Sequence, residues 1–222
     1  MSISISNDIT EIKIIIIGKS DSGKTSYVNR WIKNTFSEAR RSTIVSEFSS
    51  KIYNYKNKLY KINFWDIAGQ DHFPYLIKAF CKDAKGCITL SNILLPSTLD
   101  DAKEWKETLD KNQTFPDGSL IPNILIQNKV DLIKKENNND NNNDEMIEEF
   151  AKKNKFDAWF KTSAKTGENV NESMDKMLEL IINKLNYFNT NYFIEHKNTL
   201  SLKTDQGSEI DKIRKNTQNN CC

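Results

Sequence analysis

Short apolar runs alternate along this chain with stretches in which apolar residues recur at helical spacing. The runs predict six strands, listed here in chain order: Ile12–Ile17, Glu47–Tyr55, Leu59–Asp66, Cys87–Ser91, Asn123–Gln127 and Ala158–Lys161. Helical spacing predicts helices over Gly23–Trp31 and Phe73–Cys81, from Leu99 to Leu109, and from Val170 onward. Strands that alternate with helices indicate an α/β fold with a mostly parallel six-stranded sheet and helices on both faces. Ligands bind such sheets at the carboxyl ends of the strands.

The last predicted helix carries a long apolar stripe, which we interpret as a core-filling face. Its members are Val170, Met174, Met177, Leu178, Ile181, Ile182 and Leu185. Between the fifth and sixth strands, Lys134–Glu149 is a low-complexity tract rich in Asn. A polar tract of this kind buries too little surface to order itself, so we expect a mobile surface insertion, centred near residues 134–145.

Composition excludes several classes of protein. The chain has 222 residues, of which 37% are hydrophobic and 28% charged, which suits one α/β domain with a tail. The formal net charge of +2 gives no electrostatic case for binding nucleic acid. No apolar stretch approaches the roughly 18–20 residues of a membrane span, and Met1–Glu11 lacks the features of a signal peptide. The four cysteines do not form a disulfide framework, so we expect a reducing compartment.

The first chemical motif is Gly18-Lys19-Ser20-Asp21-Ser22-Gly23-Lys24-Thr25, directly after the first strand and before a helix. This segment, the phosphate loop, has the spacing G-x-x-x-x-G-K-[ST], in which backbone N–H groups surround phosphate oxygens. Residues Ser20–Ser26 are therefore predicted to bind the phosphates of a nucleotide. Within them Lys24 reaches the β- and γ-phosphates, and the Thr25 hydroxyl ligates Mg²⁺.

A second motif, Asp66-Ile67-Ala68-Gly69-Gln70, ends the third predicted strand. A carboxylate at that position can hold Mg²⁺ through water. Gly69 can offer its backbone N–H to the γ-phosphate, and Gln70 is placed to orient the attacking water as the catalytic residue.

Two further segments predict selection of guanine. In the guanine loop, Asn128–Asp131, the Asp131 carboxylate can accept hydrogen bonds from guanine N1–H and the 2-amino group, a pair of donors that adenine lacks. Asn128 can reach N7 and tie this loop to the phosphate loop, while the Lys129 stem can cover the base. In the guanine turn, Thr162–Lys165, the Ala164 N–H would meet guanine O6 beside Ser163 and Lys165.

Taken in order, these motifs resemble the Rab family of small GTPases, within the Ras superfamily, over residues 11–188. The resemblance implies a P-loop GTPase with GTP or GDP and Mg²⁺ as ligands, and Thr43 completing the Mg²⁺ shell only with a γ-phosphate. It also implies effectors, an exchange factor, a GTPase-activating protein and a dissociation inhibitor or prenylation escort. Leu109–Pro122 and Phe156–Phe160 look similar to the Rab branch of lysosome-related organelles and phagosomes.

The two ends of the chain fit this resemblance. Residues 1–10 and 189–222 are expected to be flexible, the latter as a tether with too balanced a charge to be a polybasic anchor. Cys221-Cys222 is similar to the double-cysteine ending of Rabs, which implies two geranylgeranyl chains and stable anchoring. We therefore expect the cytoplasmic face of an endolysosomal, phagosomal or lysosome-related membrane, with cycling through the cytosol.

Several positions depart from the family pattern. Asp21 stands where Gly or another small residue is usual, and its charge lies near the phosphates, so we expect faster nucleotide release than from an Asp21→Gly variant. Val45-Ser46-Glu47, His72 and Phe80-Cys81 alter surfaces that contact effectors and exchange factors. Two other classes stay open: a nucleotide-binding scaffold with little hydrolysis, which Asp21 favours, and a P-loop kinase, which Asn128–Asp131 disfavours.

Overall fold

The isoleucine run near the N-terminus becomes the central strand of a parallel sheet in the computed structural model, which describes residues 9–38, 43–44, 46–69, 74–133 and 140–188. This strand, β1 (Thr10–Ile17), pairs in parallel with β3 (Lys58–Ile67) on one side and β4 (Gly86–Asn92) on the other. Every residue from Ile14 to Ile17 is fully buried. A strand covered on both faces reads as a continuous apolar run, which is why the sequence identifies it so clearly.

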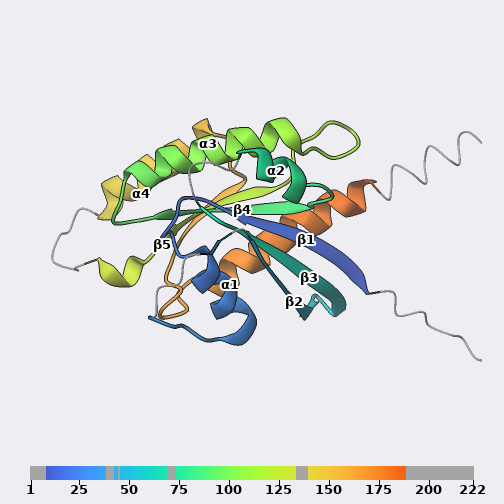
Figure 1. The fold of residues 1–222 in the computed structure, drawn as a ribbon, viewed down its shortest axis with the longest axis horizontal. Coiled ribbons are helices and arrows are strands. Elements are labelled where there is room, and N and C mark those ends of the chain that lie inside the picture. The colour runs from blue at the N-terminus through green and yellow to red at the C-terminus, as the bar shows by residue number, and fades with distance from the viewer. Residues whose placement is uncertain (1–8, 39–42, 45, 70–73, 134–139, 189–222) are drawn as a thin grey trace, which may run out of the picture. The chain divides into compact units, whose positions relative to one another are not determined.

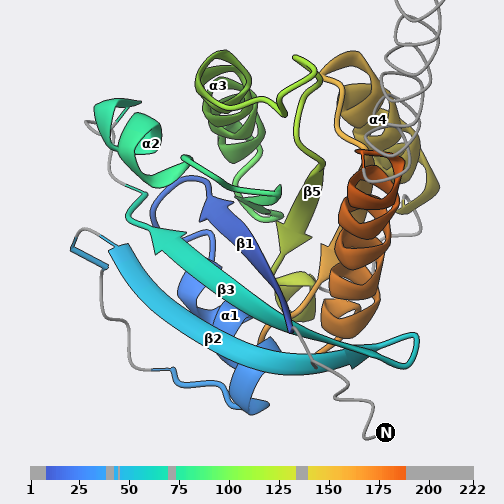
Figure 2. The same ribbon diagram turned by 90° about the vertical axis from the view of Figure 1, so that its right-hand side faces the viewer.

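The sheet has the predicted six strands, in the order β2-β3-β1-β4-β5-β6. β2 (Ser46–Tyr55) runs antiparallel to β3, and β5 (Asn123–Asn128) and β6 (Ala158–Thr162) continue the parallel part. Figure 2 shows β2, β3 and β1 side by side, with β2 at the edge. The expectation of a mostly parallel α/β sheet is confirmed, and it brings the ends of β1, β3, β4, β5 and β6 to one edge.

Helices cover both faces of this sheet (Figure 1). α2 (Pro74–Phe80), α3 (Ser97–Asn112) and α4 (Asp140–Lys153) lie on one side, whereas α1 (Lys24–Lys33) lies on the other with the helical residues 170–181. A one-turn 3₁₀ helix, η1 (Val130–Leu132), follows β5. The apolar stripe predicted for the last helix is confirmed in its first part, since Val170, Met174, Met177, Leu178 and Ile181 are all buried.

The expectation that the Asn-rich tract is unstructured through Glu149 was wrong for its second part. Residues 140–149 belong to α4, whose later turns bury Ile147 and Ala151 against Phe156 and Ala102. A narrow apolar stripe at the end of the tract therefore has a partner in the core, which compensates for ordering the polar turn before it. Residues 134–139 lie outside the described part of the chain.

The chain divides into two units, Met1–Ile181 and Ile182–Cys222. The sheet and the labelled helices belong to the first. In the second, residues 182–188 are described and are helical, with the Lys184 ammonium 5.5 Å from the Phe188 ring centroid. Among the described helices, none combines the length and the apolar character that a bilayer crossing requires.

Candidate functional site: a nucleotide cradle at the carboxyl edge of the sheet

The phosphate loop joins β1 to α1 and depends on two glycines in the left-handed backbone region. Gly18 has a φ of 132° and Gly23 a φ of 90°. A Cβ on Gly18 would lie 2.1 Å from the Leu90 carbonyl oxygen, and one on Gly23 would lie 2.3 Å from the Asn128 Nδ2. Both positions therefore require glycine for their backbone angles and for space. We call the loop from Gly18 to Lys24 the cradle; its Ser22 is fully buried.

Lys24 lies inside this cradle rather than in solvent. Its ammonium donates hydrogen bonds to the Gly18 carbonyl at 2.8 Å and to the Lys19 carbonyl at 2.9 Å. Burial lowers the pKa of Lys24 to about 8, against the opposing effect of Asp66 and Asp21. An anion in the cradle would favour the charged form, so the site is prepared for phosphate. Ser20 lies in the same loop and Ser26 in the first turn of α1.

Three oxygen-bearing side chains from different segments converge beside Lys24. The Thr25 hydroxyl donates to Asp66 Oδ2 and lies 3.0 Å from the Thr43 hydroxyl. Asp66 Oδ1 is buried with no hydrogen-bond partner, and burial raises the pKa of this carboxyl to about 6, although Thr25 and Lys24 lower it. A carboxylate oxygen without a hydrogen-bond partner, on a side chain that also contacts the Thr25 hydroxyl, belongs to a ligand set that suits Mg²⁺, which prefers oxygen ligands. These residues fit the ion that the sequence predicts.

The second motif leads back to the phosphate loop. The Ser20 N–H donates to the Gly69 carbonyl at 2.9 Å, so the end of β3 and the phosphate loop are joined by their backbones. Gly69 is thus beside the cradle, while its predicted contact with a γ-phosphate stays a prediction. Gln70, the predicted catalytic residue, lies outside the described residues, as do Cys221 and Cys222.

Asn128 connects the phosphate loop, the guanine loop and the guanine turn. Its Nδ2 donates to the Ser22 carbonyl at 3.0 Å, which is the predicted tie to the phosphate loop. Its Oδ1 accepts from the Thr162 hydroxyl at 3.2 Å and from the Ala164 N–H at 3.1 Å. The Ala164 N–H, expected to meet guanine O6, is therefore directed at Asn128 in this structure. The buried amide of Asn128 uses both its ends to fix three segments.

The carboxylate predicted to recognise guanine is held from the guanine turn. The Ser163 hydroxyl donates to Asp131 Oδ1 at 2.6 Å and accepts from the Thr166 N–H at 3.0 Å. Asp131 is half-buried and is the middle residue of η1. Ser163 therefore orients Asp131, a role for this residue that complements its predicted place in the guanine turn.

Three charged residues that the sequence motifs do not include, Arg30, Glu38 and Asp101, make contacts with residues of the site. The Arg30 guanidinium on α1 donates to the Ala164 carbonyl at 2.7 Å and also to the Lys165 carbonyl. Glu38 pairs with Lys165 at 3.0 Å, and Asp101 on α3 pairs with Lys19 at 3.4 Å. These contacts join residues more than eighty positions apart, and no local pattern reveals them. Arg30 could have been suspected only as a cation in the last turn of α1.

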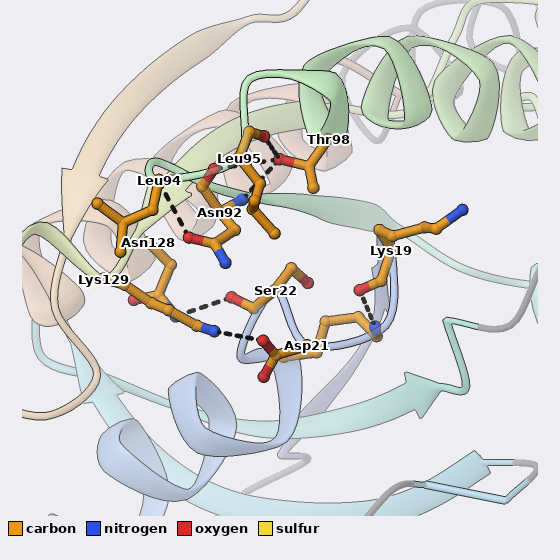
Figure 3. A network of polar contacts seen from close by, with 10 residues as sticks. Lys19, Asp21, Ser22, Asn92, Leu94, Leu95, Thr98, Asn128 and Lys129 are labelled. Carbon is orange, nitrogen blue, oxygen red and sulfur yellow. Dashed lines mark hydrogen bonds and ion pairs between the residues drawn. The ribbon is translucent and has the colours of Figure 1, made fainter. Parts of the chain in front are cut away.

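Lys129 and Asp21 also form an ion pair, with 3.0 Å between Nζ and Oδ2. Figure 3 shows Lys129 directed toward Asp21 and Asn128 toward Ser22, so two neighbouring contacts connect the guanine loop with the phosphate loop. The arrangement thus offers an anion cradle, an oxygen cluster for a divalent cation, and an oriented carboxylate for base recognition.

Comparison with known proteins finds relatives that are all Ras-related proteins. Residues 13–183 match the Ras family. The chain is 31% identical to the human Ras-related protein Rab-32, over 95% of this chain and 88% of that protein. It is 29% identical to the human Ras-related protein Rab-7L1, over 95% and 96%, and 30% identical to Ras-related protein Rab-32C of Dictyostelium discoideum, over 79% and 75%.

Proposed function

This chain belongs to the Ras family, as a Rab-like small GTPase that hydrolyses GTP and acts as a switch in vesicle trafficking, and we propose which of its residues carry out that cycle. The observation on which the proposal rests is the convergence of Thr25, Thr43 and Asp66 beside the buried ammonium of Lys24. These residues come from the phosphate loop, from the segment before β2 and from β3. A ligand that contacts all three would link nucleotide state to the position of Thr43.

Thr25, Thr43 and Asp66 would hold Mg²⁺ together with the phosphate oxygens of GTP. The ion, when bound, neutralises charge that develops on the phosphates. The chain's own part is to place Lys24 and the backbone N–H groups of residues 20–26 around the β- and γ-phosphates. Thr43 and Gly69 would be ordered by the γ-phosphate and released after hydrolysis, which is the switching event.

Guanine selection falls to Asp131, which Ser163 already orients. A base without the paired N–H donors would leave this carboxylate unsatisfied, at a cost on the order of 1–3 kcal/mol. Asn128, Lys129, Ala164 and Lys165 complete the base site. The Ala164 N–H would turn from Asn128 Oδ1 toward guanine O6, or share its hydrogen between the two oxygens.

Gln70 would orient the attacking water as the catalytic residue. Since we identify no arginine finger in the sequence, unassisted turnover is expected to be slow, on the order of 10⁻⁴ s⁻¹, and an activating protein would accelerate it. An effector or exchange factor would bind a cluster of three aromatic rings, those of Phe48, Trp65 and Phe80. The ring centroids of Phe48 and Trp65 lie 5.5 Å apart, and those of Trp65 and Phe80 lie 5.6 Å apart. Phe48 is 54% exposed, which suits an effector or exchange factor.

The location that we propose is the cytoplasmic face of an endolysosomal, phagosomal or lysosome-related membrane. Geranylgeranyl chains on Cys221 and Cys222 would provide the anchor, and an escort or dissociation inhibitor would return the protein to the cytosol. The similarity to Rab-32 and Rab-7L1 supports this branch of the family.

The first test is to identify the nucleotide that copurifies. The protein is purified without added nucleotide, denatured, and the released compound is separated by chromatography. Mostly GDP is expected, because guanine selection and hydrolysis then both operate. Mostly GTP would favour the alternative of a nucleotide-binding scaffold with little hydrolysis. The acidic Asp21 in the phosphate loop is the feature that favours this alternative. An adenine nucleotide would contradict the assignment of Asp131, and an empty site would mean that Asp21 weakens phosphate binding too much for ordinary cycling.

The second test addresses Gln70. Replacing Gln70 with Leu removes the amide that orients water, so GTP is expected to persist and stimulated hydrolysis to fall by at least about a hundredfold. Single-turnover hydrolysis of labelled GTP, with and without an activating protein, measures the effect. GDP affinity serves as the control, because Gln70 is not expected to contact the diphosphate. Undiminished stimulated hydrolysis would remove Gln70 from the catalytic role.

A further inference from the structure

One ion pair connects the part of the site that would bind phosphate with the part that would bind the base. Asp21 belongs to the phosphate loop and Lys129 to the guanine loop, and their charged atoms are 3.0 Å apart. Both residues have left-handed backbone angles, with φ values of 63° and 74°. Asp is among the residues that tolerate this region best, and Lys is not, so the conformation at Lys129 must be imposed by its surroundings.

Neighbouring contacts hold the two loops in place around this pair. The Asn128 amide donates to the Ser22 carbonyl at 3.0 Å, one residue along from each partner of the ion pair (Figure 3). The Lys129 carbonyl accepts from the Leu132 N–H at 3.1 Å, and the Lys19 carbonyl accepts from the Ser22 N–H at 3.3 Å. Exposed ion pairs usually contribute little because ordering two long side chains is costly. Here hydrogen bonds hold the backbones on both sides, and only 19% of the Lys129 side chain is exposed, against 53% for Asp21, so water screens this pair less than a fully exposed one.

The charge of Asp21 also reaches the phosphate-binding lysine. Asp21 and Lys24 belong to the same loop, in which the Lys24 ammonium is hydrogen-bonded to the Gly18 and Lys19 carbonyls. A carboxylate in this loop without a neighbouring cation would weaken binding of a polyphosphate by direct repulsion. The Lys129 ammonium is the cation that the structure places on this carboxylate, with only 19% of the lysine side chain exposed.

We propose that Asp21 is a positioning residue for Lys129, and that Lys129 in turn neutralises Asp21, so that the phosphate loop and the guanine loop release nucleotide as one coupled unit. This inference rests on the proposed nucleotide site and deepens it. Lys129 then has two tasks: its stem covers the base and its charge protects the phosphates. If position 21 held a neutral residue, Lys129 would only have to cover the base.

A double-mutant cycle on GDP release tests the coupling. Lys129→Met keeps an unbranched stem and removes the charge, whereas Asp21→Asn keeps the shape and the tolerance of positive φ. In the protein that retains Asp21, Lys129→Met is expected to accelerate release of a fluorescent GDP by about tenfold. In the Asp21→Asn background the same change should accelerate release by less than about threefold, because no carboxylate is left to expose.

Lys129→Arg separates a charge effect from a structural one. If charge is what matters, Lys129→Arg should release GDP at least about threefold more slowly than Lys129→Met. A purely structural role would make the two variants equally fast. Circular dichroism of each GDP-loaded variant checks that it is folded. Glu148→Gln and Lys152→Met, which disrupt an exposed ion pair on α4, form a matched control cycle that should leave GDP release unchanged.

The proposal is overturned if Lys129→Met accelerates GDP release by the same factor in both backgrounds, or if Lys129→Arg is as fast as Lys129→Met. Failure of the proposed function has a different signature. In that case the unmodified protein would not bind GDP at all, and no cycle could be measured. Tight GDP binding with no coupling would therefore reject the ion-pair inference alone.

Discussion

The surroundings of two carboxylates, the buried Asp66 and the more exposed Asp157, separate a binding role from a structural one. Desolvation of the carboxyl group raises the pKa of both, and for Asp157 the hydrogen bond from Asn123 opposes this effect. Asp157 Oδ2 accepts the Asn123 N–H at 2.7 Å, and this hydrogen bond anchors the start of β5 to the turn before β6. Asp66 instead keeps one buried oxygen without a partner. The unsatisfied oxygen, together with the neighbouring hydroxyls of Thr25 and Thr43, is the observation that supports the proposed role of Asp66 as a cation ligand, since most buried polar atoms have hydrogen bonds.

The raised pKa of Asp157 makes stability depend on pH. A carboxyl whose pKa is higher in the folded state binds its proton more tightly there, so its contribution is greatest at acid pH and is lost as pH rises through the folded-state pKa. Asp157→Asn mimics the protonated form and can still accept the Asn123 N–H. The variant should therefore be more stable than the unmodified protein at pH 7, and this difference should disappear at about pH 4 and below.

Urea denaturation of both proteins with saturating GDP and Mg²⁺, from pH 4 to 8, measures this difference. Glu149→Gln on the exposed face of α4 is the control, and should track the unmodified protein across the range. A difference between Asp157→Asn and the unmodified protein that is constant with pH would show that desolvation of the carboxylate is not its cause.

At the scale of elements, α1 is fixed to the helix that begins at residue 170 by a polar contact inside the core. The Tyr27 hydroxyl is fully buried and lies 2.7 Å from the Ser173 hydroxyl, which also donates to the Val170 carbonyl at 3.0 Å. Burial raises the pKa of Tyr27, so the phenol stays protonated and remains a donor. Since the phosphate loop continues directly into α1, this contact helps to hold the cradle in position.

The two hydroxyls should not be equivalent when each is removed. Tyr27→Phe leaves Ser173 with the Val170 carbonyl, and should cost about 1 kcal/mol of unfolding free energy. Ser173→Ala leaves the Tyr27 hydroxyl buried with only a 3.5 Å contact to that carbonyl, so the cost should be larger, about 2 kcal/mol. Equilibrium unfolding in urea compares them, and a greater loss for Tyr27→Phe would contradict this accounting of partners.

The elements also show what the sequence can and cannot predict. β1 and the phosphate loop are predictable because a continuous isoleucine run and fixed glycine spacing are local signals. α4 is harder to predict, because its polar first turns depend on burial of Ile147 and Ala151 against Phe156 later in the chain. In the site, Thr25 and Asp66 follow from motifs, whereas the contacts of Arg30 with the guanine turn depend on tertiary packing that no local period encodes.

For the whole molecule, the nearly balanced charge and the proposed lipid anchor predict where the protein resides. With a net charge of +2, the chain has little general attraction for anionic membranes, so two lipid chains would supply the affinity. Replacing both Cys221 and Cys222 with Ser is expected to move the protein from membrane to soluble fractions. Replacing one of them should give partial and reversible association, since one chain anchors only marginally.

Fractionation of cells that express each cysteine variant measures this distribution. GDP content after purification is the control, and should not change, because the residues proposed to bind nucleotide lie within residues 18–165 of the chain. Continued membrane residence of the doubly substituted protein would place the anchor elsewhere.

The pairing of β1 has a consequence for how the protein is made. The central strand is synthesised first, yet its neighbours are β3 and β4, and the Asn128 that closes the cradle contacts Ala164 still later in the chain. Most of the first unit must therefore be synthesised before the phosphate loop can make all its contacts. Parallel pairing between strands that are far apart in the sequence is also slow to form. Nucleotide captured at that moment would stabilise only a finished domain. We expect GTP or GDP to act in the cell as the final component of folding, taken up by nascent chains once Ser173 and the rest of the helix that packs on α1 have emerged.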